Sequence, residues 1–130
     1  MPNWCENRVR ISGDEEDIKK FVKLVQGKGE EGDFWFKNVI PQPEYVELET
    51  GADLSVLPYD ASWTSANWGT KTEVGNDIEH WDIHAEEAEW DFYTAWGPPE
   101  EICSKLREMF PNIDVSWFFN EPGMEIAGYL

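Results

Sequence analysis

The two histidines of the chain, His80 and His84, are the residues whose type is best suited to binding a metal. They frame the segment HWDIH, and two histidines one turn apart on a helix can share a zinc ion. The alternation of Trp81, Ile83 and Ala85 predicts a strand instead, on which residues four apart lie ~13 Å apart. The glutamate that follows the first histidine of a zinc protease is replaced here by Trp81. We therefore predict no metal site, and two partly exposed histidines.

The segment EHWDIHAEEAEWD carries several carboxylates, which a glycosidase uses in pairs as acid and base. Such a pair needs a set separation in a cleft and one raised pKa. Among 27 Asp and Glu residues, some neighbouring acids are expected by chance. The sequence has no GxSxG, Walker or GxGxxG motif. We predict a protein that is not an enzyme and carries no cofactor.

The charge of the chain is strongly negative and unevenly spread. The formal net charge is -17, and residues 72–104 contain ten Asp or Glu but no Lys or Arg. A field of this sign repels nucleic acids and anionic membranes and attracts basic surfaces. The partner we expect is therefore the basic surface of another protein, with no direct contact to nucleic acid or membrane.

An ordered row of carboxylates can imitate a nucleic-acid backbone, while the plainer interpretation of the same acids is solubility. Exposed tryptophan and tyrosine are favoured anchors in protein interfaces. The residues that we predict to contact a partner are Asp82, Glu86, Glu87, Glu89, Asp91, Tyr93, Trp63 and Trp68.

The aromatic residues divide into two groups. Trp90, Phe92, Trp117 and Phe119 are in phase with predicted strands, which favours a place in the core. A second group lies at strand ends or in a polar loop, where it either lines a ligand pocket or forms a small core beneath the loop. The possible pocket residues are Trp4, Trp68, Lys71 and Trp96. A phosphorylated ligand would require Arg8, Arg10 and Lys71 to gather locally.

The first half of the chain alternates between strand and helix patterns. Residues 7–12, NRVRIS, read as a half-buried strand, and a helix follows from Ser12–Asp14 to the glycines at 27 and 29. Residues 33–40, DFWFKNVI, read as a second strand that ends at two prolines. Residues 44–75 form the least regular part, which we predict to be a long inserted loop with short helical pieces.

The second half predicts a strand within 78–96 and then a helix. Pro98 and Pro99 suit the helix entry, and Glu100 and Glu101 suit its positive end. Residues 113–119 and 124–130 read as two strands of a hairpin. The order is βαββαβ with an extra C-terminal strand. This predicts an α+β, ferredoxin-like fold in a single domain of residues 1–130, with an antiparallel sheet and two helices on one face.

The two cysteines, Cys5 and Cys103, lie far apart in the sequence and belong to no CxxC motif. We expect them to be buried thiols in a reducing compartment. An iron–sulfur cluster is excluded, because four ligating cysteines are absent. The polar start of the chain has no apolar signal stretch, and no run approaches the ~20 apolar residues of a membrane span. We expect a cytoplasmic protein.

Three segments, MPNWCENRVRISG, NWGTK and FYTAWGPPEEI, together resemble the YubB ferredoxin-like domain family of bacteriophages and plasmids. The resemblance runs from Met1 to the end of the chain. It implies a ferredoxin-like fold, an origin in a phage or other mobile element and a bacterial host cell. It implies no catalytic residues.

Our leading hypothesis is that this phage or mobile-element protein inhibits a host nucleic-acid-handling defence complex, a CRISPR effector or a restriction enzyme. It would do so through an acidic surface that mimics nucleic acid. The alternative is a protein that binds or sequesters a nucleotide or another metabolite in an aromatic pocket. A hydrolase that uses acidic residues is a third hypothesis.

Overall fold

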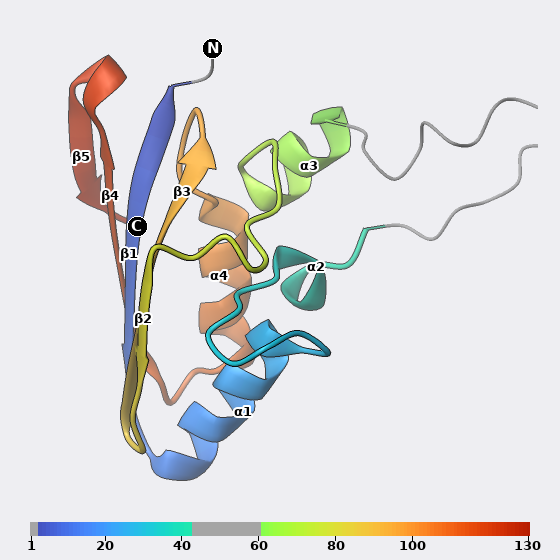
Figure 1. Cartoon of the computed structure of the whole chain (residues 1–130), viewed down its shortest axis with the longest axis vertical. Helices are drawn as coiled ribbons and strands as arrows, with labels where there is room; N and C mark the ends of the chain where they lie inside the picture. The colour runs from blue at the N-terminus through green and yellow to red at the C-terminus, as the bar shows by residue number, and fades with distance from the viewer. Residues whose placement is uncertain (1–2, 43–60) are drawn as a thin grey trace, which may run out of the picture.

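The computed structural model describes residues 3–42 and 61–130, in which five strands form one antiparallel sheet with the order β2-β3-β1-β4-β5 (Figure 1). The chain runs through β1 (Trp4–Ser12), α1 (Glu15–Gln26), α2 (Phe36–Val39), α3 (Ala61–Trp68), β2 (His80–Ile83) and β3 (Glu87–Ala95). It continues through α4 (Glu100–Met109), β4 (Asp114–Glu121), a short 3-10 turn η2 (Pro122–Met124) and β5 (Ile126–Tyr129). None of the described helices is long and apolar enough to cross a membrane.

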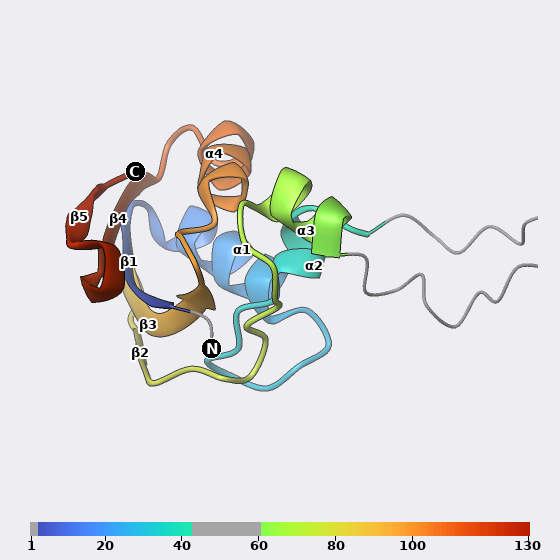
Figure 2. The same cartoon turned by 90° about the horizontal axis from the view of Figure 1, so that it is seen from above.

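The predicted fold is confirmed. Strands β2, β3, β1 and β4 have the order of a βαββαβ ferredoxin-like sheet, and β5 adds the extra strand beside β4. Figures 1 and 2 show the helices on one face of the sheet, whose other face is open. The two predicted helices are α1 and α4, and α2 and α3 extend the same layer.

The two long helices follow from their sequence patterns. Helix α1 buries Ile18, Phe21 and Val25 and begins with acidic residues at the positive end of its dipole. It ends at Gly27, whose φ of 57° suits glycine. Its N-cap, Asp14, makes no side-chain capping bond, although the sequence has capping-box spacing. Helix α4 starts after Pro99 and buries an apolar stripe against the sheet.

The second predicted strand, residues 33–40, is wrong. Phe34 makes an isolated bridge to Gly75, and α2 follows. The carboxylate of Glu73 accepts hydrogen bonds from the backbone N–H groups of Phe36 (2.6 Å) and Lys37 (3.0 Å), which fixes the start of that helix. Phe34 and Phe36 are both fully buried, so their alternation reflects two core contacts and not a strand. Burial raises the pKa of the Glu73 carboxyl despite these bonds.

The strand-like region 78–96 is a hairpin of two strands. In it β2 pairs with β3, and the N–H of His84 donates to the carbonyl of Glu87 at 2.8 Å across the turn. The second strand of the ferredoxin-like sheet is therefore β2. Of the predicted inserted loop, residues 44–60 lie outside the described part of the chain, and residues 61–68 form α3.

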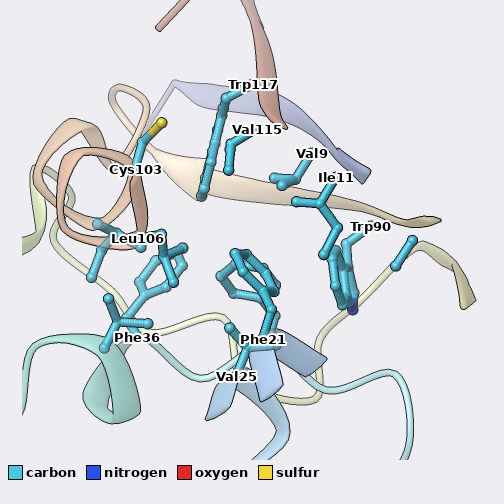
Figure 3. Packing of buried hydrophobic residues seen from close by; sticks show 14 of the residues in the cluster. Val9, Ile11, Phe21, Val25, Phe36, Trp90, Cys103, Leu106, Val115 and Trp117 are labelled. Atoms are coloured by element: carbon cyan, nitrogen blue, oxygen red, sulfur yellow. The ribbon is translucent and has the colours of Figure 1, made fainter. Parts of the chain in front are cut away.

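Aromatic side chains fill the space between the sheet and the helices. Phe34 packs against Phe21, Trp90 and Trp117, with ring centroids 6.4, 5.2 and 5.9 Å away. Figure 3 shows Phe21, Trp90 and Trp117 converging from the helix and strand sides. The predicted core role of Trp90, Phe92 and Trp117 is confirmed by their full burial.

Asn7 is a buried polar residue on the same face of β1. Its Nδ2 donates to the Cys5 carbonyl (3.1 Å) and to Thr94 Oγ1 (2.9 Å), and its Oδ1 accepts from Trp117 Nε1 (3.0 Å). These bonds join β1 to β3 and β4. Thr94 Oγ1 in turn donates to the carbonyl of Gly97 at 2.6 Å, which holds the chain as it leaves β3.

Replacing Asn7 with alanine should destabilise the protein by about 3 kcal/mol, because it leaves the buried Trp117 N–H without an acceptor and Thr94 without its donor. Urea unfolding followed by tryptophan fluorescence measures this loss. Asn120→Ala, on the half-buried end of β4, is the matched control and should cost less than about 0.5 kcal/mol. Equal losses for the two variants would contradict a special role for Asn7.

The two cysteines are buried free thiols, as expected from the sequence. Burial, followed by the nearby charge of Glu121, raises the pKa of Cys5 to about 11. Burial also raises the pKa of Cys103, which lies on the apolar stripe of α4. Both effects keep the thiols protonated and unreactive at neutral pH.

Native protein at pH 8 should therefore react very slowly with a colorimetric thiol reagent, since a pKa of about 11 leaves roughly one thiolate in a thousand. Both thiols should react within minutes once guanidinium chloride unfolds the chain. Absorbance of the released reagent gives both results. Rapid reaction of the native thiols would contradict the buried placement.

Candidate interaction surface

The helices leave one face of the sheet uncovered, and we call it the open face (Figure 2). Because successive strand residues point to opposite faces, the residues between the buried positions of β1 and β3 project here. The strand register sets them in rows. One row runs Asp82, Glu89, Arg10 and Ser116, and the next runs His80, Asp91, Arg8, Phe118 and Tyr129.

The five predicted acidic contacts lie on or beside the β2–β3 hairpin. Glu86 and Glu87 are exposed at its turn, and Asp82 is exposed on β2. Glu89 and Asp91 project from the middle of β3 and are half-buried. We call Asp82, Glu86 and Glu87 the acidic tip. The five acids are therefore neighbours on the hairpin, and their contact with a partner stays a prediction.

Two arginines of β1 offset part of this negative charge. Arg10 Nε donates to Glu89 Oε2 at 3.1 Å, and Arg8 Nε lies 3.5 Å from Asp91 Oδ1. That Asp91 oxygen is buried and has no hydrogen bond, so the charge of Arg8 is its main compensation. Both arginines are well exposed, and each pair therefore contributes at most about 1 kcal/mol. The acidic tip keeps its net charge, and the middle of the face does not.

The two histidines lie in the same region but do not converge. His84 Nε2 is 3.0 Å from Asp82 Oδ2, and His80 Nε2 is 3.4 Å from Glu89 Oε1. The hydrogen bond and charge of Asp82 raise the pKa of His84. Within residues 3–42 and 61–130, no group of three or more His, Cys, Asp or Glu side chains is placed to hold a metal ion.

The predicted aromatic pocket is only partly assembled. Trp4 and Trp96 are each 51% exposed. Trp4 pairs with Ala95 at the end of β3, and the Trp96 N–H donates to the Asn3 carbonyl at 2.7 Å, so the two tryptophans share one end of the sheet. Thr70 Oγ1 donates to the Ala95 carbonyl at 3.1 Å, which brings Lys71 to the same end.

Trp68 does not belong to this pocket, and its predicted role as an exposed anchor is wrong. It is 2% exposed, and its Nε1 donates to the Ile40 carbonyl at 2.8 Å. Its ring packs against Phe36 and against Trp63, each with centroids 5.8 Å away. Trp63 is half-buried on the same cluster. The small core beneath the loop, which the sequence left as an alternative, accounts for both tryptophans. Of the predicted aromatic anchors, Tyr93 is 47% exposed on the open face.

Two aromatic residues of the open face were missed. Phe118 and Tyr129 are cross-strand neighbours on β4 and β5, with ring centroids 5.3 Å apart. The sequence signal that could have identified Phe118 is its position on the strand. It directly follows the core residue Trp117, so its side chain must point away from the helices. Both residues share a row with Arg8.

Asp82→Asn should lower the pKa of His84 toward the ordinary value of 6.5, because the substitution removes the carboxylate whose hydrogen bond and charge raise it. A raised folded-state pKa stabilises the protein below the unfolded pKa, and this contribution is lost as pH rises through the folded value. The variant should therefore be slightly less stable than wild type below pH 6.5 and equal to it at high pH. Histidine NMR titration and melting curves measure both effects. Asp114→Asn on β4 is the control and should leave the His84 titration unchanged; an unshifted His84 in Asp82→Asn would refute the pairing.

Comparison with known proteins places this fold in a family. Residues 59–130, more than half of the chain, match the family described as the ferredoxin-like domain in Api92-like protein. The crystal structure of protein api92 from Yersinia pseudotuberculosis is similar with a TM-score of 0.57 and 13% sequence identity, covering 99% of this chain and 93% of that one. At this identity the likeness shows the fold alone. No curated protein matches the chain. The chain belongs to the family of ferredoxin-like domains in Api92-like proteins.

Proposed function

We propose that this protein is a non-enzymatic binding protein that docks through the acidic tip of the β2–β3 hairpin onto a basic protein surface. The observation that carries the proposal is the acidic tip itself. Asp82, Glu86 and Glu87 are exposed at one end of the sheet. Within the described residues Asp82 pairs with His84, and none of the three acids forms an ion pair with a lysine or arginine. Surface charge of this kind steers association more than it adds affinity.

The arrangement of the acids supports imitation of nucleic acid at the tip more than over the whole face. Glu87, Glu89 and Asp91 repeat every second residue of β3, which spaces them by roughly 6.6 Å along the strand. Arg10 and Arg8 are paired with the last two of these acids. A channel lined by lysine or arginine can therefore contact the acids from Glu87 over the turn with little competition from Arg8 and Arg10.

The partner that we propose is a nucleic-acid-handling defence complex of a bacterial host, a CRISPR effector or a restriction enzyme, which the protein would inhibit in the cytoplasm. Channels in such complexes are positive because they hold a phosphate backbone. The proposal also rests on the three segments that resemble the YubB ferredoxin-like domain family of bacteriophages and plasmids. Within the wider ferredoxin-like family, we propose that the chain belongs to that group of mobile-element proteins.

The chemistry of the described residues supports binding in preference to catalysis. Burial raises the pKa values of three groups, Glu73, Cys5 and Cys103. Each of them has a structural role, because Glu73 caps α2 and the two cysteines lie within the core. None of these three borders the acidic tip. A hydrolytic pair would need a carboxyl of raised pKa beside an ionised one in a cleft.

A second candidate function, binding of a nucleotide or another metabolite, is supported by a different observation. Arg8 and Arg10 gather on the open face, which is the local positive charge that a phosphorylated ligand requires. Aromatic rings lie on both sides of them. Trp4 and Trp96 are exposed at one end of the sheet, and the exposed Tyr129 packs against the half-buried Phe118 on β5 and β4.

Reversing the charge of the tip with Glu86→Lys and Glu87→Lys should abolish partner capture, whereas Glu30→Lys with Glu31→Lys should not. The second pair is exposed in the loop after α1 and changes the net charge by the same amount. The experiment captures proteins from a bacterial lysate on immobilised wild type and both variants at low and high salt, followed by mass spectrometry. We expect wild type and the control to retain a nuclease or effector complex at low salt and to release it at high salt. Retention of the same complex by the tip variant would refute the docking site.

A further inference from the structure

We propose that the open face carries a second binding site, over β1, β4 and β5, for a small ligand that joins a planar aromatic ring to an anionic group, as a nucleoside monophosphate does. The site is a surface hollow of about 170 Å³ lined by Arg8, Arg10, Ser116, Phe118 and Tyr129. The inference rests on the second candidate function, nucleotide or metabolite binding, and it does not depend on docking by the acidic tip. No residue of the tip lines this hollow, although Arg10 also borders the neighbouring hollow that Asp82 and Glu87 line.

The strand register brings an anion-binding half and a ring-binding half together. Arg8 pairs with Phe118, and Phe118 pairs with Tyr129, so the three form one row across β1, β4 and β5. Neighbouring strands are ~4.8 Å apart, which puts β1 and β5 roughly 10 Å apart. Arg10 and Ser116 form the adjacent row. A phosphate over β1 and an attached ring over β5 match this span.

The guanidinium groups retain donors for an anion. Arg10 is bonded through Nε to Glu89, and its side chain is 62% exposed. Arg8 uses Nε toward Asp91, and its terminal nitrogen is 3.9 Å from Glu6 Oε1, a long and weak ion pair. Each guanidinium has five N–H donors, so a second edge can bind a phosphate while the first stays paired.

The same carboxylates set the size of the anion. Glu6, Glu89 and Asp91 outnumber the two arginines by one negative charge locally, and the whole chain carries -17. A long nucleic acid, with one charge for every phosphate, would meet net repulsion beyond the hollow. A single phosphate can contact both arginines and places no further negative charge beyond the hollow. Charge balance therefore favours a mononucleotide-sized ligand over a nucleic-acid strand.

The ring-binding half is formed by aromatic surface that the core does not use. Tyr129 is 72% exposed, and its ring is tilted by 59° against Phe118. Exposed aromatic rings on a sheet stack planar groups, and each stacked base contributes on the order of 1–3 kcal/mol. The hollow is smaller than an enclosed ligand pocket of ~300 Å³ or more, so the ligand stays partly in solvent. We expect a dissociation constant on the order of 0.1–1 mM.

The test is an NMR titration of the full-length, isotope-labelled protein with adenosine monophosphate, adenosine and inorganic phosphate. Adenosine monophosphate should shift the amide signals of residues 8–10, 116–118 and 128–129. It should bind at least about tenfold more tightly than adenosine or phosphate, because only the joined ligand uses both halves. Arg10→Ala and Tyr129→Ala should each weaken binding about five- to tenfold. The spectra themselves report whether each variant is folded, and Tyr129→Leu replaces Tyr129→Ala if the latter unfolds.

Two controls isolate the site. Tyr93→Ala removes an exposed tyrosine of the same face that does not line the hollow, and Lys20→Ala removes an exposed positive charge on α1. Both should bind like wild type, and so should the Glu86→Lys, Glu87→Lys variant, which separates this site from the docking tip. No shifts at 10 mM adenosine monophosphate would overturn the proposal, and so would equal binding of inorganic phosphate or shifts centred on Trp4 and Trp96.

Discussion

The buried amide of Asn7 is the interaction on which the arrangement of the sheet depends. It is fully buried, and its hydrogen bonds go to Cys5 on its own strand, Thr94 on β3 and the Trp117 indole on β4. Slipping either neighbouring strand by one residue would turn its side chains to the opposite face and leave these groups buried without partners. The network therefore holds the three central strands in one register, and that register decides which residues face solvent.

Because the helices cover one face, the other is free for binding. The core side is packed with aromatic rings around Phe34, whereas the open side carries charges and a smaller number of rings, among them the pair Phe118 and Tyr129. Its two regions differ in character. The β2–β3 end carries exposed carboxylates, of which Asp82 pairs with His84. The β1, β4 and β5 region combines paired arginines with Phe118 and Tyr129. One register thus produces an acidic surface and a more neutral, aromatic one side by side.

Most of the fold could be predicted from the sequence, but less of the site. The alternation in 7–12 and 113–119 and the apolar stripes of α1 and α4 are local patterns, and the two strands and two helices that these patterns predict are present. Residues 33–40 were wrongly predicted to be a strand, because Phe34 and Phe36 are two residues apart and both buried, as alternate residues of a strand are. Trp68 was predicted to be exposed because its neighbours in the sequence are polar, whereas its ring is buried against Phe36 on another segment. Local pattern does not reveal a contact of that kind.

The sequence by itself determined the ferredoxin-like fold class, the burial of Trp90, Phe92 and Trp117, and the clustering of acids in 72–104. It assigned the second strand to residues 33–40, whereas the structure places that strand at β2. The tertiary structure decided which of those acids keep their charge uncompensated. Arg10 meets Glu89 across 79 positions of the chain, and Phe118 meets Tyr129 only because β5 folds back along β4. The physical reason is that periodicity records which way a side chain points within its own element, whereas charge compensation and ring pairing depend on which strands become neighbours.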